Sequence, residues 1–335
     1  MTQQTAPQLS KSRYIAGLQC LKRLWLEVYR HDLADEVSAG QQALFDSGTA
    51  VGELARKRFP DGVLIQEPYY AHAQAVRSTQ ALLSDVFRPA LYEAAFAWQD
   101  IRTRVDILAR VTPREFDLIE VKSSTSLKKK EHIPDIAIQL YITEGCGVPV
   151  RRACLMHIDN SYVYEGGEHD LDRLFTLEDV TDRARRYIET ELPAALEGMR
   201  GTLQQDAAPP IETGRQCAAP YRCSFYDHCH QNQPPHPILE LPRLGKAGYE
   251  QLSNAGIRTI DAVPPDYPDL TELQRRVWKS VTTGQPHIGP DLAPRLREIR
   301  APITFMDFET LSAAVPVYIG TRPYQNIPFL SLIHI

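Results

Sequence analysis

Residues 101–124 read IRTRVDILARVTPREFDLIEVKSS and decide the fold. Polar and apolar residues alternate on both sides of the turn-like TPRE, which predicts a β-hairpin. Asp106 lies on the first strand, and Glu120 and Lys122 lie on the second. Because side chains two apart on a strand project from the same face, we expect Glu120 and Lys122 to point the same way, beside Asp106.

Two carboxylates and a lysine in this arrangement suit the hydrolysis of a phosphodiester bond. Asp106 and Glu120 are hard oxygen ligands for Mg²⁺ or Mn²⁺, and such an ion polarises a phosphate and lowers the pKa of a bound water. Lys122 would orient that water or stabilise the charge that develops on the phosphate. Glu-x-Lys alone is typical of a surface salt bridge, and it is the additional Asp106 that favours a nuclease.

The segments around the hairpin predict an α/β fold. Apolar residues recur at helical spacing before the hairpin and again after it, and two further segments have the composition of strands. The expected helices cover residues 10–29, 41–58, 71–87 and 136–144, and the expected strands are ACLMHID at 153–159 and SYVYEG at 161–166.

VDIL at 105–108 and IEVKSS at 119–124 resemble the core motif of the RecB-like branch of the PD-(D/E)XK nucleases. This resemblance implies a restriction-endonuclease-like core in which the backbone carbonyl of Val121 also binds the metal. Gly48-Thr49-Ala50-Val51-Gly52-Glu53 is similar to the family's upstream Gly-Thr-x-Val-His-Glu, with Gly52 in place of the metal-binding histidine. The resemblance therefore implies either that Glu53 completes the metal shell or that the site is weaker.

Two further positions enter through the same resemblance. Gln139 and Tyr141 are similar to a glutamine and a tyrosine that the family carries on a helix near its active site, at a shorter spacing here. Glu93, just before the hairpin, is interpreted either as another acid of the metal shell or as a residue of a surface helix.

A cysteine cluster follows the predicted nuclease core. Cys217, Cys223 and Cys229 have five residues between successive members, and Cys20 lies far upstream in the first helix. Four thiolates suit tetrahedral zinc or a 4Fe-4S cluster, and for zinc His228 or His230 is an alternative fourth ligand.

The order of these four cysteines resembles a subset of RecB-like nucleases that bind 4Fe-4S with one cysteine before the core and three after it. This implies an iron-sulfur cluster, with Zn²⁺ as the alternative. Cys146 and Cys154 lie in apolar surroundings and are interpreted as inert core thiols.

The last residues contain a second acidic pair. Asp307 and Glu309 in TFMDFET lie two apart on an expected strand and resemble the first motif of DnaQ-like, RNase H-fold exonucleases. The stretch around them resembles the start of an uncharacterised bacterial domain fused to RecB-like nucleases, so we expect a partial second site. The alternative is a solvent-facing acid pair.

Composition limits the function classes. The net charge of -5 argues against a protein that coats nucleic acid through bulk charge, although residues 1–30 carry five basic residues against Glu27, and Lys128, Lys129 and Lys130 follow the Glu-x-Lys motif. With no apolar run of membrane length and no secretory signal, we expect a cytoplasmic protein without membrane contacts.

We expect three regions: a RecB-like nuclease domain over residues 1–235, a helical linker with a weak resemblance to helix-hairpin-helix over 236–300, and the truncated start of a DnaQ/RNase H-like domain over 301–335. The expected substrate is single-stranded or end-bearing DNA, by analogy with the family, with RNA as an alternative. The competing hypothesis is a catalytically degenerate module that binds nucleic acid and keeps a structural four-cysteine metal site.

Overall fold

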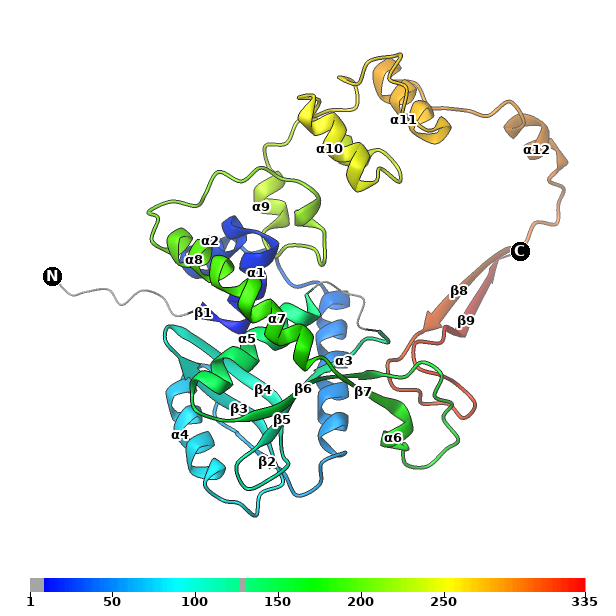
Figure 1. Ribbon diagram of the computed structural model, residues 1–335. Helices are drawn as coiled ribbons and strands as arrows, with labels where there is room; N and C mark the ends of the chain where they lie inside the picture. Colours follow the sequence, from blue (N-terminus) through cyan, green and yellow to red (C-terminus); the bar gives the residue numbers. More distant parts are fainter. Residues whose placement is uncertain (1–8, 127–130, 335) are drawn as a thin grey trace.

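A seven-stranded mixed sheet forms the centre of the protein in the computed structural model, which describes residues 9–126 and 131–334 (Figure 1). The strands follow the order β2-β3-β4-β5-β6-β7, and β1 pairs with β4. Their bounds are Leu9–Ser10 for β1, Val63–Leu64 for β2, Ala90–Trp98 for β3, Ile101–Arg110 for β4, Phe116–Lys122 for β5, Val150–Ile158 for β6 and Phe175–Asp179 for β7.

The predicted hairpin is confirmed. Strands β4 and β5 pair antiparallel, with Ile107 opposite Ile119 and Leu108 opposite Leu118. Strand β3, which pairs antiparallel with β4, was not predicted. Seven of its nine residues are buried or half-buried, so its apolar run lacks the alternation that identifies a strand with one exposed face.

Helices cover both faces of the sheet. Helix α5 (His132–Gly145) connects β5 to the parallel strand β6, and it packs in the larger core with α1 (Lys11–Gln19), α7 (Thr181–Thr190) and α8 (Leu192–Leu203). Helix α3 (Ala39–Arg56) packs on the other face through Val51 and Ala55, and it stands upright beside the sheet in Figure 1. Helix α4 (His72–Leu83) lies against β3. The predicted helices at 41–58, 71–87 and 136–144 therefore exist.

Two predictions about local structure are wrong. The helix expected over 10–29 is divided into α1 and α2 (Leu21–Tyr29), because Cys20 has an extended backbone with φ -165° and ψ 123°. The segment 161–166 is not a strand: the backbone of Tyr164 bonds to residues 320 and 321, and within the described chain the segment has no strand pairing with the sheet. The place beside β6 is taken by β7.

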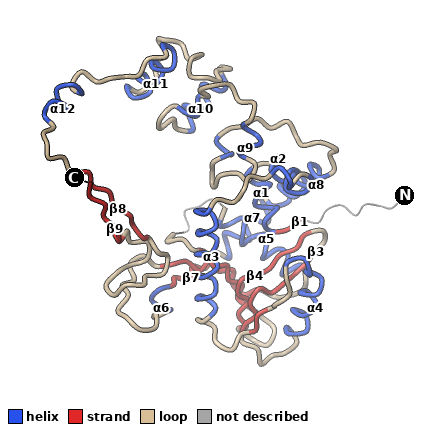
Figure 2. The backbone as a smooth tube through the Cα atoms, turned by 180° about the vertical axis from the view of Figure 1, so that it is seen from behind, coloured by secondary structure: helices blue, strands red, loops and turns tan. Residues whose placement is uncertain are grey.

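The region after the cysteines has a small core of its own, formed by residues of 238–281. It contains α10 (Lys246–Asn254) and α11 (Glu272–Thr283), is preceded by the short helix α9 (Tyr226–His230), which carries Cys229, and is followed by α12 (Leu292–Glu298). These helices form an arc that leads to the antiparallel pair β8 (Phe305–Leu311) and β9 (Ile327–His334), as seen from behind in Figure 2. Within the described residues, no helix is both long and apolar enough to cross a bilayer.

Candidate active site

Asp106 and Glu120 lie on neighbouring strands, where the regular pairing of β4 with β5 ends. Beyond the Ile107–Ile119 pair, the carboxylate of Asp106 replaces the backbone partner of β5: its Oδ2 accepts a hydrogen bond from the N–H of Val121 at 2.8 Å. Glu120 follows on the face that carries Leu118 and is only 3 % exposed. The hairpin thus brings both acids to one position, where Glu120 is buried and Asp106 is half-buried.

Helix α5 supplies two side chains that face these acids. Gln139 donates from Nε2 to Glu120 Oε2 at 2.7 Å. Lys122 donates from Nζ to Glu120 Oε1 at 2.7 Å and also contacts the carboxylate of Asp135. Asp135 and Gln139 are four residues apart, so they lie on the same side of the helix. Asp135 was missed by the sequence reasoning, although this spacing was a usable signal.

A second lysine arrives from the N-terminal end of the described chain. Lys11 Nζ lies 3.1 Å from both Oε atoms of Glu120 and 3.7 Å from Oδ1 of Asp135. It stands there because β1 pairs with β4, with Leu9 opposite Ile101. The sequence reasoning treated Lys11 only as part of a basic stretch, and no spacing rule connects it to a glutamate 109 residues away.

The charges of this cluster are strongly coupled. Burial, together with the neighbouring charge of Glu120, raises the pKa of Asp106 to about 7. Burial also acts to raise the pKa of Glu120, but the positive charges of Lys11 and Lys122 outweigh it and hold that pKa well below its usual range. For Lys122, burial is outweighed by Asp135 and Glu120, which raise its pKa. Of Asp106, Glu120 and Lys122, Asp106 thus has the pKa nearest to neutrality.

The donor set fits a hard divalent cation in its chemistry. As the side chains stand, no three His, Cys, Asp or Glu groups among the described residues are arranged to hold an ion, and lysine ammonium groups contact Glu120. The oxygens of Asp106, Glu120 and the Val121 carbonyl are nevertheless the ligand type that Mg²⁺ and Mn²⁺ prefer. Gln139 Oε1 is buried without a partner, which leaves an acceptor for a water or another donor.

The structure does not bring every predicted residue to this cluster. Tyr141 packs against the larger core and lies near Arg200, because a residue two positions from Gln139 falls on the opposite side of a helix. Glu53 is exposed on α3 and, within the described part of the chain, has no hydrogen bond or ion pair to Asp106 or Glu120. Lys128, Lys129 and Lys130 lie outside the described residues.

Glu93 is a strand residue, so the surface-helix interpretation is wrong. It lies on β3 between the Tyr92–Ile107 and Ala94–Val105 pairs, across from Asp106. Its backbone has φ +56°, and its carboxylate pairs with Arg56 at 2.7 Å. A left-handed backbone at a non-glycine residue is uncommon and is enriched near functional sites.

A cavity of about 160 Å³ opens next to Asp106. Basic and polar side chains dominate its lining. Among them, Arg104 is 9 % exposed, and its Nε has no hydrogen-bond partner. The lining comprises Ser10, Lys11, Ser12, Tyr69, His72, Glu93, Arg102, Thr103, Arg104 and Asp106. This arrangement suits an anionic group that approaches the carboxylates from the β3–β4 side.

The four predicted cysteine ligands line one small cavity. Cys20, Cys217, Cys223 and Cys229 surround a space of about 20 Å³ between α2 and the 215–230 segment. Backbone N–H groups of Gly214 and Phe225 donate to the sulfurs of Cys217 and Cys223 at 3.5 Å. Cys20 lies at the junction of α1 and α2, where its backbone is extended. Four thiols with N–H donors suit zinc or an iron-sulfur cluster equally.

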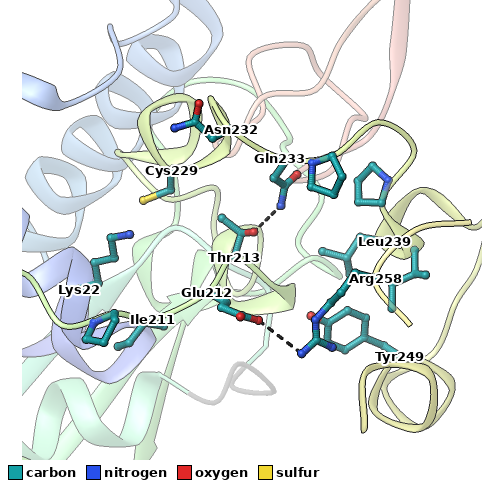
Figure 3. Close-up of a pocket in the computed structure, with 14 residues that line it drawn as sticks. Lys22, Ile211, Glu212, Thr213, Cys229, Asn232, Gln233, Leu239, Tyr249 and Arg258 are labelled. Atoms are coloured by element: carbon teal, nitrogen blue, oxygen red, sulfur yellow. Dashed lines mark hydrogen bonds and ion pairs between the residues drawn. The ribbon is translucent and has the colours of Figure 1, made fainter. Parts of the chain in front are cut away.

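A larger pocket of about 570 Å³ adjoins the cysteine cavity, and Lys22 and Cys229 line both (Figure 3). On its other side, Arg258 pairs with Glu212 at 3.5 Å. Of the remaining thiols, Cys154 is buried as expected. Cys146 is exposed, so its interpretation as a core thiol is wrong; it ends α5, where the chain turns back toward the surface.

The second acidic pair lies on an exposed strand. Both Asp307 and Glu309 are exposed on β8, and Asp307 Oδ1 accepts a hydrogen bond from the N–H of Phe308. The role of this pair as part of a second site stays a prediction.

Comparisons with known proteins touch two parts of the chain. A family described as a domain of unknown function (DUF2779) matches residues 304–335, whereas no curated protein matches significantly.

Similar solved structures include an alkaline exonuclease from Laribacter hongkongensis, with 16 % identity, a TM-score of 0.33, and coverage of 59 % of this chain and 90 % of that one. The complex of this exonuclease with dAMP has 17 % identity and a TM-score of 0.32, with coverage of 59 % of this chain and 90 % of that one. The crystal structure of SSO0001 has 13 % identity and a TM-score of 0.30, with coverage of 62 % of this chain and 81 % of that one. Likeness at this level assigns no activity.

Proposed function

We propose that this protein is a metal-dependent nuclease that hydrolyses DNA phosphodiester bonds and is stabilised by a 4Fe-4S cluster. One observation carries the proposal: Asp106, Glu120 and Lys122 meet at the end of the hairpin, with Asp106 bonded to the Val121 N–H at 2.8 Å and Lys122 2.7 Å from Glu120. A surface salt bridge, the alternative for Glu-x-Lys, does not require a buried glutamate beside a second carboxylate.

Each side chain has a role that its contacts support. Asp106, Glu120 and the Val121 carbonyl would hold Mg²⁺ or Mn²⁺, which when bound supplies a Lewis acid for the phosphate and a more acidic water. Lys122 remains protonated and directs positive charge to the place where the phosphate gains negative charge. Gln139 orients Glu120 through its 2.7 Å hydrogen bond. We leave Glu53 and Tyr141 out of this set, because neither contacts a carboxylate of the site.

The proposed substrate is single-stranded or end-bearing DNA. The cavity beside Asp106 supports a phosphate backbone as the ligand, since Lys11, Arg102 and Arg104 contribute three cationic side chains to its lining. Contacts with phosphates carry affinity rather than base specificity. RNA offers the same phosphates, so the choice between the two nucleic acids is left to experiment.

The proposed cluster has a structural role. Its ligands would join Cys20 to Cys217, which are 197 positions apart, and so connect the two ends of the nuclease region. A crosslink between distant residues stabilises a fold by restricting the unfolded chain. Zinc in place of the cluster would have the same effect, and iron content with a visible spectrum after anaerobic purification distinguishes the two.

Cleavage of labelled DNA in the presence of Mn²⁺ tests the function. We expect the wild-type protein to cut single-stranded DNA, and Lys122→Ala to lose about 10²-fold or more in rate while its circular dichroism spectrum is unchanged. Lys57→Ala, at an exposed lysine after α3, is the matched control and should cut normally. A wild-type protein that binds DNA without cutting it under any divalent metal favours the degenerate binding module, and preferential cutting of RNA reassigns the substrate.

A further inference from the structure

Lys11 takes part in two features of the site at once. Its ammonium contacts Glu120 at 3.1 Å and Asp135 at 3.7 Å, and its side chain also lines the cavity beside Asp106. Glu120 already has a second cationic partner in Lys122 at 2.7 Å. Lys11 is therefore placed to contact a ligand in the cavity as well as to neutralise Glu120.

The backbone around Lys11 is held by strand pairing and by a helix cap, whereas its side chain is long and has several rotatable bonds. Strand β1 pairs with β4 through Leu9 and Ser10, and Ser10 Oγ accepts the N–H of Arg13 at 3.2 Å to begin α1. Lys11 is the first residue of that helix. A lysine carries its charge on a flexible four-carbon stem, so the ammonium can reach different partners from one backbone position.

The cavity side carries two further cations beside the acids Glu93 and Asp106. Arg102 and Arg104 line the same space as Lys11. Arg104 Nη2 donates to the carbonyls of Glu67 and Pro68, whereas its Nε is buried without a hydrogen-bond partner. An anion bound there would meet Lys11 together with the two arginines. The three carboxylates of Asp106, Glu120 and Asp135, of which Asp106 also lines the cavity, lie near the ammonium groups of Lys11 and Lys122, and one negative charge remains when all five groups are ionised.

We propose that Lys11 is a positioning residue that transfers its ammonium from the carboxylates to a substrate phosphate when a divalent ion binds. In the metal-free site Lys11 balances Glu120 and Asp135. With an ion held by Asp106, Glu120 and the Val121 carbonyl, the Lys11 ammonium would leave Glu120 and would pair with a phosphate in the cavity. The ion and one phosphodiester together add one positive charge, which offsets the one negative charge left by Asp106, Glu120, Asp135, Lys11 and Lys122; Arg102 and Arg104 supply further positive charge to the phosphate. This inference depends on the proposed nuclease function. It adds that metal binding comes first and strengthens substrate binding.

Two binding measurements on the full chain test the transfer. Mn²⁺ affinity is measured by calorimetry, and affinity for a labelled single-stranded oligonucleotide is measured by anisotropy with Ca²⁺ present to limit cleavage. We expect Lys11→Met to bind Mn²⁺ about ten-fold more tightly, since a competing positive charge is gone, and to bind the oligonucleotide about ten-fold more weakly. Lys11→Arg should restore oligonucleotide binding. Lys57→Met, at the exposed lysine after α3, should change neither affinity.

The opposite directions separate this role from a structural one. A lysine that only maintains the fold weakens both affinities when it is replaced, and that result overturns the proposal, as does a Lys11→Met protein with both affinities unchanged. In either case, cleavage of DNA by the wild-type protein leaves the nuclease function standing. A wild-type protein that binds no Mn²⁺ and cuts no DNA overturns the function and the transfer together.

Discussion

Asp106→Asn is expected to raise the free energy of unfolding at neutral and higher pH while it abolishes DNA cleavage. Burial and the charge of Glu120 raise the pKa of Asp106 from 3.8 to about 7. The folded protein therefore binds this proton more tightly than the unfolded chain does, so the free energy of unfolding decreases as pH rises from about 4 to about 7. Asparagine removes the ionisable group and with it this loss of stability.

The size of the effect follows from the two pKa values. The interval from 3.8 to about 7 is about 3 pH units, which corresponds to about 4 kcal/mol at 1.36 kcal/mol per unit. The asparagine side chain keeps an oxygen that can accept the Val121 N–H. We therefore expect Asp106→Asn to be more stable than wild type by about 2–4 kcal/mol at pH 8 and to lose this advantage toward pH 4, while DNA cleavage is abolished.

Denaturation by guanidinium in the presence of a chelator, repeated across this pH range, measures the difference. Asp117→Asn, on the neighbouring strand β5, is the matched control. Burial acts to raise the pKa of Asp117, but hydrogen bonds from Arg151 and Arg152 outweigh it and lower that pKa. The stabilisation by Asp117 is thus present at neutral pH and is lost as pH falls, so Asp117→Asn should be destabilised at pH 8. If both substitutions destabilise the protein equally at pH 8, the reasoning about Asp106 is refuted.

Five other substitutions address the remaining residues. Gln139→Ala should lower the cleavage rate about ten-fold because Glu120 loses its orienting donor, whereas Glu53→Gln should cut at the wild-type rate; the reverse order would restore Glu53 to the metal shell. Cys217→Ser should lose bound iron and visible absorbance after anaerobic purification, and Cys154→Ser should keep both; iron retained in Cys217→Ser would contradict the ligand set. Phe225→Ala, which removes a fully buried ring beside α2, should lower the free energy of unfolding by about 3–5 kcal/mol, and an unchanged thermal midpoint would argue against that packing.

Local periodicity accounts for what the sequence predicts correctly. The alternation in 101–122 defines the β4–β5 hairpin and the shared face of Glu120 and Lys122. Helical spacing defines α3 and most of α5. Strand β3 could not be predicted in this way, because a strand that is buried on both faces has no alternation of polar and apolar residues.

Lys11, Tyr141 and Cys20 are positioned by features that local sequence patterns do not report. Lys11 reaches Glu120 only because β1 joins the sheet beside β4. Tyr141 follows the family pattern in sequence but, two residues from Gln139, falls on the opposite side of α5. Cys20 interrupts a pattern that is otherwise continuous for a helix, and no local propensity reports such a break.

An anomalous difference map from crystals of the protein grown with Mn²⁺ tests the central claim most directly. The account predicts one strong peak within ligand distance, about 2.2 Å, of the carboxylates of Asp106 and Glu120 and of the Val121 carbonyl, with Lys11 turned away from Glu120. The absence of a peak at these oxygens, with both lysines still bound to Glu120 at saturating Mn²⁺, would contradict it.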